Sequence, residues 1–251
     1  MKICKLAFFA LALIAGSAAH AQQPPPAPTP VPGAPPSASD QGIRVRGLAF
    51  QLAAPPTDIY VHDAAAPPGI VGAKLDVKGY LNHEFSLLPI RGKNVVCTKS
   101  SDPASIKDPA NILAKATLPD KFKNGIFMFL PGTGAPGAPM FRILVVDDST
   151  SAFPRGSFKV MNLSPVTVRI QLEKETFEFK SGEMKLIEDP PVGENQSSGM
   201  RAFSQAGSQW QKIGSGIWPH PGDKRVLQVL FENPGTKQVE LRGIRDVAVT
   251  Y

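Results

Sequence analysis

The most regular hydrophobic pattern of the chain lies at residues 166–180, where apolar and polar side chains alternate. Apolar residues occupy every second position of residues 166–172, as a half-buried β-strand requires, whereas an amphipathic helix would place them three and four apart. Phe177 and Phe179 then continue the apolar pattern on odd positions. Because a hairpin turn restarts the alternation, the change of phase across residues 173–176 predicts such a turn.

Similar short apolar runs, separated by turns rich in glycine and proline, recur from residue 41 onward. They predict two sets of strands, at residues 43–50, 58–62, 73–79, 83–88, 94–99, 112–117, 125–130 and 141–147, and at residues 157–163, 166–173, 176–180, 184–187, 200–206, 209–217, 225–231 and 237–242. A short turn within residues 108–116 is the one helical pattern. Runs of this length and spacing predict an all-β fold of two tandem antiparallel β-sandwich modules, over residues 41–154 and 155–251.

The joint between the predicted modules lies within residues 141–180. Residues 141–147 form the last strand of the first module, residues 150–156 a linker, and residues 157–180 the first strands of the second. Because this linker is short, we expect the two sandwiches to touch. Asp147 and Asp148 are interpreted as the solvated end of the joint rather than as calcium ligands.

The two modules also resemble each other. Residues 43–46 and 59–61 parallel residues 158–161 and 168–170, and residues 127–132 and 141–147 parallel residues 229–235 and 239–246. Agreement in order at both ends favours an internal repeat, in which shorter loops in the second copy account for the change of offset. Two unrelated sandwiches, or one large irregular β-domain, are the alternatives.

The first 40 residues are interpreted as export and tether segments. Two lysines precede an apolar run at residues 6–16 and a small-residue site at residues 19–21, which predicts a cleaved secretory signal over residues 1–21. The apolar run is about half of the ~20 residues that span a bilayer, so we expect no transmembrane segment in the mature chain. Residues 22–40 contain eight prolines and predict a disordered spacer, which acts either as a tether or as a tolerated tail.

The composition and charge of the chain limit the classes of partner that we expect. The chain has 251 residues, of which 42% are hydrophobic, and a formal net charge of +6, so it can build two cores. Loss of the signal removes two positive charges and leaves +4, spread over both modules. Because no basic cluster with interleaved aromatic residues is present, we expect no nucleic-acid partner. Cys97 is the one cysteine after the signal, and its apolar neighbours predict a buried residue without a disulfide.

No motif in the chain predicts catalysis or a cofactor. Residues 132–137 match Gly-x-Gly-x-x-Gly, but Pro136 and Pro139 exclude the helix that follows a phosphate-binding loop, so we interpret them as a flexible loop. The histidines and carboxylates lack metal-ligand spacing, and a Gly-x-Ser-x-Gly elbow is absent from the sequence. We therefore expect no catalytic residue, no cofactor and no metal.

Trp210, Trp218 and His220 form the one stretch with the character of a binding site. They gather among glycine, serine and glutamine residues, and flat rings with amide neighbours suit a sugar or peptide surface. The alternative, which we favour, is that the two tryptophans fill the core of the second sandwich.

The sequence FKVMNLSP at residues 158–165, followed by an alternating strand, resembles the opening of small immunoglobulin-like repeats found in secreted bacterial proteins of unknown function. The order of signal, spacer and paired modules is similar to that of uncharacterised two-module envelope proteins. The resemblance covers the last half of the chain, and the first module in outline. It implies an immunoglobulin-like fold and an envelope location, with no established activity to carry over.

These patterns together predict an exported, periplasmic or extracellular protein with a non-enzymatic interaction or structural role in the cell envelope. Its expected partner is another envelope protein or a polysaccharide. Two alternatives stay open: a carbohydrate- or peptide-binding module that uses the aromatic face of residues 210–220, and a hydrolase with a dispersed site.

Overall fold

The computed structural model describes residues 42–247. The signal predicted for residues 1–21 and the spacer predicted for residues 22–40 lie outside the described residues. Within the described part, no helix is long and apolar enough to cross a membrane.

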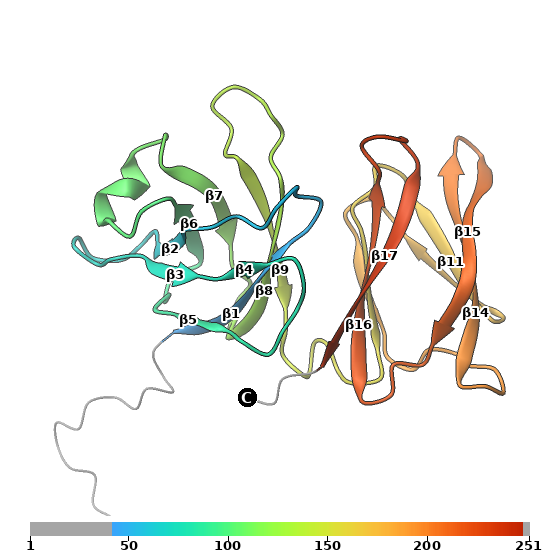
Figure 1. Cartoon of the computed structure of the whole chain (residues 1–251). Coiled ribbons are helices and arrows are strands. Elements are labelled where there is room, and N and C mark those ends of the chain that lie inside the picture. The colour runs from blue at the N-terminus through green and yellow to red at the C-terminus, as the bar shows by residue number, and fades with distance from the viewer. Residues whose placement is uncertain (1–41, 248–251) are drawn as a thin grey trace, which may run out of the picture. The chain divides into compact units, whose positions relative to one another are not determined.

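The first module consists of two sheets (Figure 1). Sheet A has the strand order β4-β1-β8-β9, with β5 also paired to β1, and sheet B has the order β3-β2-β6-β7. The strands are β1 (Ile43–Ala49), β2 (Ile59–Asp63), β3 (Ala73–Leu75), β4 (Val77–Lys78), β5 (Ser86–Leu88), β6 (Asn94–Thr98), β7 (Ile112–Thr117), β8 (Asn124–Pro131) and β9 (Phe141–Asp147).

The second module also consists of two sheets. Sheet C has the strand order β13-β10-β16-β17, and sheet D has the order β12-β11-β14-β15. The strands are β10 (Phe158–Asn162), β11 (Val168–Leu172), β12 (Glu175–Phe179), β13 (Met184–Ile187), β14 (Ser197–Ala206), β15 (Gln209–Pro219), β16 (Lys224–Glu232) and β17 (Val239–Val247).

The all-β class and the tandem sandwich architecture predicted from the sequence are confirmed. Most neighbouring strands are antiparallel, but the first strand of each module lies parallel to its penultimate strand, β1 beside β8 and β10 beside β16. Strand β4 also pairs in parallel with β1. The two modules share this unusual pairing, and sheets B and D match in strand order, so their topology supports the internal repeat. Sheet A differs from sheet C in having five strands instead of four.

Two local features refine the sequence-based expectations. The hairpin predicted at residues 173–176 has a two-residue connection, since β11 ends at Leu172 and β12 begins at Glu175. The turn expected within residues 108–116 is present at residues 109–111, and a short 3₁₀ helix, η2, precedes it at Pro103–Lys107. Its position follows from local chemistry, because Asp102 accepts a hydrogen bond from the N–H of Ala104 at 2.8 Å and proline favours the first helical position.

The side chains form three hydrophobic cores rather than two. Each sandwich has its own core, and a third lies between the outer faces of sheets A and C. Strand β8 contributes Phe127 and Phe129 to the first core and Ile126 and Met128 to the third, so both of its faces are buried. Burial on both faces explains why residues 126–130 of β8 are all apolar, and why residues 226–231 of β16 are apolar except for Gln228. The sheets therefore follow one another in the order B, A, C, D.

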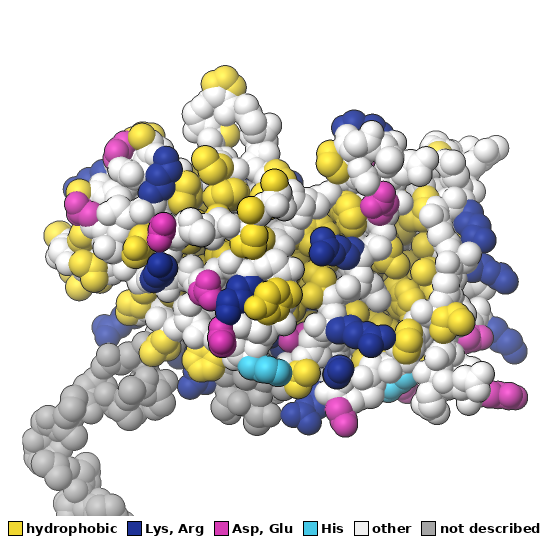
Figure 2. All heavy atoms as spheres, in the orientation of Figure 1, with side chains coloured by type: hydrophobic (Ala, Val, Ile, Leu, Met, Phe, Trp, Pro, Cys, Tyr) yellow, Lys and Arg dark blue, Asp and Glu magenta, His cyan; other side chains and the backbone are white. Residues whose placement is uncertain are grey.

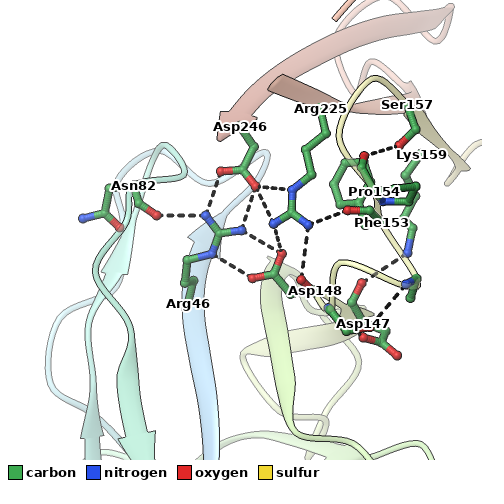
Figure 3. Close-up of polar contacts among 12 residues, drawn as sticks. Arg46, Asn82, Asp147, Asp148, Phe153, Pro154, Ser157, Lys159, Arg225 and Asp246 are labelled. Atoms are coloured by element: carbon green, nitrogen blue, oxygen red, sulfur yellow. Dashed lines mark hydrogen bonds and ion pairs between the residues drawn. The ribbon is translucent and has the colours of Figure 1, made fainter. Parts of the chain in front are cut away.

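A buried group of four charges lies at the same junction of sheets A and C (Figure 3). Arg46 of β1 donates two hydrogen bonds to Asp148 at 3.0 and 2.8 Å and two to Asp246 of β17 at 2.7 and 2.8 Å. Its fifth donor bonds the carbonyl oxygen of Asn82 at 2.8 Å. All five N–H groups of this guanidinium therefore have acceptors.

Arg225 of β16 approaches the same two carboxylates from the second module. Its Nε donates to Asp246 at 2.9 Å, and one terminal nitrogen also contacts Asp148. The other terminal nitrogen donates to the carbonyl oxygens of Asp148 at 3.2 Å and Phe153 at 2.7 Å. The Phe153 ring lies 4.5 Å from the centre of this guanidinium. Arg225 thus binds the linker, the first module and β17 at once.

The group is electrically balanced, with two arginines and two aspartates, all less than 5% exposed. Burial lowers the pKa of Arg46, but the hydrogen bond to Asp246 and the charges of both aspartates outweigh it and raise the pKa above its ordinary value. The position of Asp148 corrects the sequence-based interpretation. Asp148 is fully buried and neutralises two arginines, and is not a solvated end of the joint.

Replacing Asp246 with asparagine should lower the free energy of unfolding by about 3–5 kcal/mol, because Arg46 and Arg225 stay buried with one compensating charge lost. Urea unfolding measures the change. The control is Asp58→Asn, which breaks an ion pair to Lys74 whose side chains are 65% and 62% exposed, and should cost less than about 1 kcal/mol. Equal effects of the two substitutions would refute the structural role of the buried charges.

Candidate functional site

The buried charges of Arg46, Asp148, Arg225 and Asp246 form one candidate site, since clusters of buried ionisable residues often mark active sites. All five donors of Arg46 are already used within the protein. Among the described residues, no buried side-chain nitrogen or oxygen lacks a hydrogen-bond partner. The four side chains therefore join the modules and offer no free donor to a ligand.

Cys97 is equally inaccessible. It lies in the first core, fully buried, and burial raises the pKa of its thiol from 9.0 to about 12. Because the thiolate is the nucleophilic form, the folded protein holds this cysteine unreactive at neutral pH. The burial predicted from its apolar neighbours is confirmed.

The Gly-x-Gly-x-x-Gly motif of residues 132–137 has a plain structural explanation. Residues 132–137 connect β8 to β9, with Gly134 and Gly137 at φ angles of 71° and 75°, and no helix begins there. The segment is a loop, as the prolines predicted. Among residues 42–247, no three histidine, cysteine, aspartate or glutamate side chains come close enough to hold a metal ion.

The structure separates the three residues predicted as a binding stretch. Trp218 is only 6% exposed and packs in the second core, with its ring centre 4.8 Å from that of Phe158. Trp210 lies on the outer face of sheet D, where the Arg169 guanidinium stacks 4.0 Å from the ring centre. His220 follows β15, and its Nδ1 accepts a hydrogen bond from the N–H of Gly222 at 3.0 Å.

A β-bulge explains why the two tryptophans point to opposite sides of one strand. Positions 210 and 218 are an even number of residues apart, so a regular strand would place them on the same face. The register of β15 against β14 shifts between Ala202 and Phe203, which leaves Ile213 as an extra residue. One extra residue inverts the alternation beyond it. As a result Trp210 faces outward and Trp218 faces the core.

The outer face of sheet D carries the polar half of the alternating pattern. Cross-strand neighbours there form one row of Gln171, Arg201 and Ser215. A second row contains Arg169, Phe203 and Lys212, and Arg169 is held by Glu178 of β12 through hydrogen bonds of 3.0 and 2.6 Å. The Trp210 ring therefore packs against Arg169, and Glu178 in turn holds Arg169 in place.

A hollow of about 550 Å³ opens on this face. It is lined by Gln171, Glu173, Gly199, Met200, Arg201, Lys212, Ser215, Gly216 and Ile217. Small residues on β14 and β15 make the depression, because they leave the sheet surface bare between longer side chains. Glu173 closes one end, where its carboxylate accepts a hydrogen bond from the N–H of Gly199.

The charges at the hollow favour an anionic ligand. Arg201 and Lys212 are exposed, and within the described part of the chain neither forms an ion pair, while Glu173 is held by the backbone. Ile217, 72% exposed, adds an apolar contact at the rim. We call this surface, formed by Trp210, Arg169, Arg201, Lys212 and the hollow, the outer D face. Of the residues on this face, the sequence pattern identified only Trp210. The others lie at outward-facing positions of the same alternating strands.

Alanine in place of Trp218 should lower the free energy of unfolding by about 3–5 kcal/mol, because it leaves a cavity in the second core. Trp210→Ala should cost less than about 1 kcal/mol, since it removes a surface ring and its contact with Arg169. Urea titrations followed by far-ultraviolet circular dichroism compare the two. A small loss at Trp218, or a larger loss at Trp210, would contradict the assignment of core and surface.

The Cys97 thiol should also make stability depend on pH. Its folded pKa of about 12 lies above the ordinary 9.0, so between these values the unfolded chain loses a proton that the folded chain keeps. This contribution to stability is complete below pH 9.0 and declines as the pH rises toward 12. The free energy of unfolding is measured against pH for the unmodified protein and for Cys97→Ala, and the difference isolates the contribution of the thiol. Parallel profiles would contradict the prediction.

Comparisons with known proteins assign the chain to no family. No protein-family model matches it, and a search of curated proteins also finds no match. Among solved structures, it is similar to a crystal structure of a proposed cell adhesion protein from Bacteroides uniformis, with 10% sequence identity over 83% of this chain and 99% of that chain. The TM-score is 0.23, and a likeness of that size carries no argument about fold or function.

Proposed function

We propose that this chain is an exported, non-enzymatic interaction protein of the cell envelope that binds an anionic polysaccharide on the outer D face. The observation that carries the proposal is the arrangement of Arg201 and Lys212 beside the hollow, with the Trp210 ring held by Arg169 on the same rigid sheet.

The chemistry of the surface suits a polymer of acidic sugars. Two exposed cations without ion pairs in the described residues can each bind a carboxylate. Gln171 and Ser215 add hydrogen-bonding groups for hydroxyls, and an aromatic ring provides area for the apolar face of a sugar. The hollow is open rather than enclosed, which accommodates a chain that continues beyond the site.

The rigidity of the surface also favours binding. The side chains project from paired strands whose opposite face is the second core, so little order has to be created when a ligand binds. The envelope location rests on the secretory signal predicted for residues 1–21 and on the resemblance to two-module envelope proteins. The same resemblance, with the absence of a catalytic motif in the sequence, supports a role without catalysis.

The double substitution Arg201→Gln and Lys212→Gln should weaken binding to polygalacturonate by about tenfold or more, because it removes both unpaired cations. Titration calorimetry measures the affinity, which should also fall as salt is raised. Neutral dextran should bind more weakly than the polyuronate to the unmodified protein.

The matched control is Lys74→Gln with Lys93→Gln, which removes two lysines of the first module that are 62% and 66% exposed. This variant has the same net charge as the test variant and should retain the affinity of the unmodified protein. Equal loss in both variants would show that binding follows net charge alone and would overturn the proposed site. An unmodified protein that binds no polyuronate would do the same.

A further inference from the structure

A hollow of about 350 Å³ opens at the end of the first sandwich where strand β1 begins, at the lower left of the first module in Figure 1. It is lined by residues 42–43 at the start of β1, residues 90–93 between β5 and β6, and residues 118–123 between β7 and β8. We call this hollow the basal pocket. The outer D face belongs to the other module, so an inference about the basal pocket is independent of the proposed polysaccharide site.

The floor of the basal pocket is apolar. Ile43, Ile90, Leu118 and Phe122 line it, and all four belong to the first core, where each is 4–8% exposed. The Phe122 ring is held against Gly125, since a Cβ at that glycine would collide with the ring. Removing apolar surface from water is favourable. An apolar chain that entered the pocket would therefore extend the first core.

The rim of the basal pocket is basic. Arg91, Lys93, Lys121 and Lys123 are exposed in its lining, and Asp120 is the one acidic residue among the described residues there. Lys93 forms an ion pair with Asp120. Within residues 42–247, the other three cations form no ion pair. Figure 2 shows lysine and arginine side chains beside hydrophobic ones at this end of the first module.

A buried carboxylate fixes one side of the rim. Asp63, 9% exposed, accepts hydrogen bonds from the N–H groups of Arg91 at 2.9 Å, Gly92 at 2.8 Å and Ala65 at 2.9 Å. Burial raises the pKa of Asp63, but these three hydrogen bonds outweigh it and hold the pKa below its ordinary value. Asp63 therefore stays ionised and holds the connection at residues 90–93 in place.

Backbone hydrogen bonds join the three segments around the pocket. The N–H of Leu118 donates to the carbonyl oxygen of Lys93 at 2.7 Å, which ties the β5–β6 connection to the β7–β8 connection. The N–H of Arg44 donates to the carbonyl oxygen of Lys123 at 2.8 Å, which ties β1 to the same connection. Because the walls are already ordered, a ligand would enter with little loss of backbone freedom.

The size and chemistry of the pocket favour an amphipathic ligand. Its volume of about 350 Å³ lies at the small end of the range of about 300–1,000 Å³ that is typical of small-molecule sites. A small inorganic anion would leave the apolar floor in water, and a hydrocarbon would leave three cations unpaired. The aliphatic stems of lysine side chains can lie along an apolar chain while their ammonium groups reach a charged head.

We propose that the basal pocket binds one molecule of an anionic amphiphile, such as a lipid with a single acyl chain. The apolar chain enters between sheets A and B and contacts Ile90 and Leu118. The head, a carboxylate or a phosphate, lies at the rim and binds Lys121, Lys123 and Arg91. The ligand is a monomer rather than a membrane surface, because the apolar residues form the floor of a hollow and do not protrude.

Laurate, kept below the concentration at which it forms micelles, is the probe, and titration calorimetry with the full chain gives its affinity. Dodecyltrimethylammonium has the same chain length with a cationic head and should bind at least about tenfold more weakly. Acetate, which has the head without the chain, should also bind at least about tenfold more weakly. The methyl NMR signals of Ile90 and Leu118 should shift when laurate binds, and that of Ile217 on the outer D face should not.

The double substitution Lys121→Gln and Lys123→Gln should weaken laurate binding by about tenfold or more, because it removes two of the three unpaired cations. The matched control is Lys107→Gln with Lys115→Gln, which removes two exposed lysines of the same module that do not line the pocket. Both variants have the same net charge, and circular dichroism and the thermal midpoint show that each is folded. Loss of binding in the first variant with retention in the control supports the proposal.

Four results would overturn the basal pocket as a ligand site. These are equal loss of binding in the two variants, equal binding of laurate and of either comparison ligand, shifts at Ile217 instead of Ile90, and no binding of laurate. Vesicles of phosphatidylglycerol that bind the protein while monomeric laurate does not would make the rim a membrane-docking surface. That result would also overturn the proposal.

Discussion

Two arginines and two aspartates, buried between sheets A and C, are the constraint on which the arrangement of the described residues depends. Arg46 binds Asp246 across 200 residues of sequence, and Arg225 binds Asp148 across 77. Each of these two ion pairs therefore joins one module to the other. A buried charge is tolerable only while its partners are present, so the apolar packing around Met128 and Leu227 and the charged contacts require the same docking of the two sandwiches.

This docking decides which surfaces are left for partners. Sheets A and C use their outer faces on each other, which buries both sides of β8 and β16. Among the described residues, no other sheet covers the outer face of sheet D, and β15 and β17 are terminal strands of their sheets. The proposed polysaccharide site lies on this outer face, and the basal pocket lies at the end of the first sandwich. The second copy of the repeat keeps the parallel pairing between the first strand and the penultimate strand of the module.

Much of the fold could be predicted from the sequence because strand alternation is a local signal. Residues 166–172 show it clearly, and the structure places a strand and a hairpin there. The third core could not be predicted in this way, since a continuous apolar run such as residues 126–130 does not reveal what covers its second face. Asp148 was misjudged for a related reason. Its two cationic partners come from strands far away in sequence, and no local pattern marks them.

The candidate surface was predicted only in part. Trp210 and Trp218 stand out by residue type, but an inserted residue near Ile213 turns them to opposite faces, and bulges leave little trace in a hydrophobic pattern. Arg201 and Lys212 occupy ordinary outward positions, and only the register between strands brings them to one hollow.

The most direct test of the docked arrangement is a urea titration followed by one probe in each sandwich. Both tryptophans of the chain lie in the second sandwich, so their fluorescence reports its unfolding. Pulse labelling of the buried Cys97 thiol, read from its peptide by mass spectrometry, reports the first. If the buried charges and the third core join the sandwiches, the two transitions coincide. Separate transitions, with one sandwich unfolding while the other persists, would contradict this account.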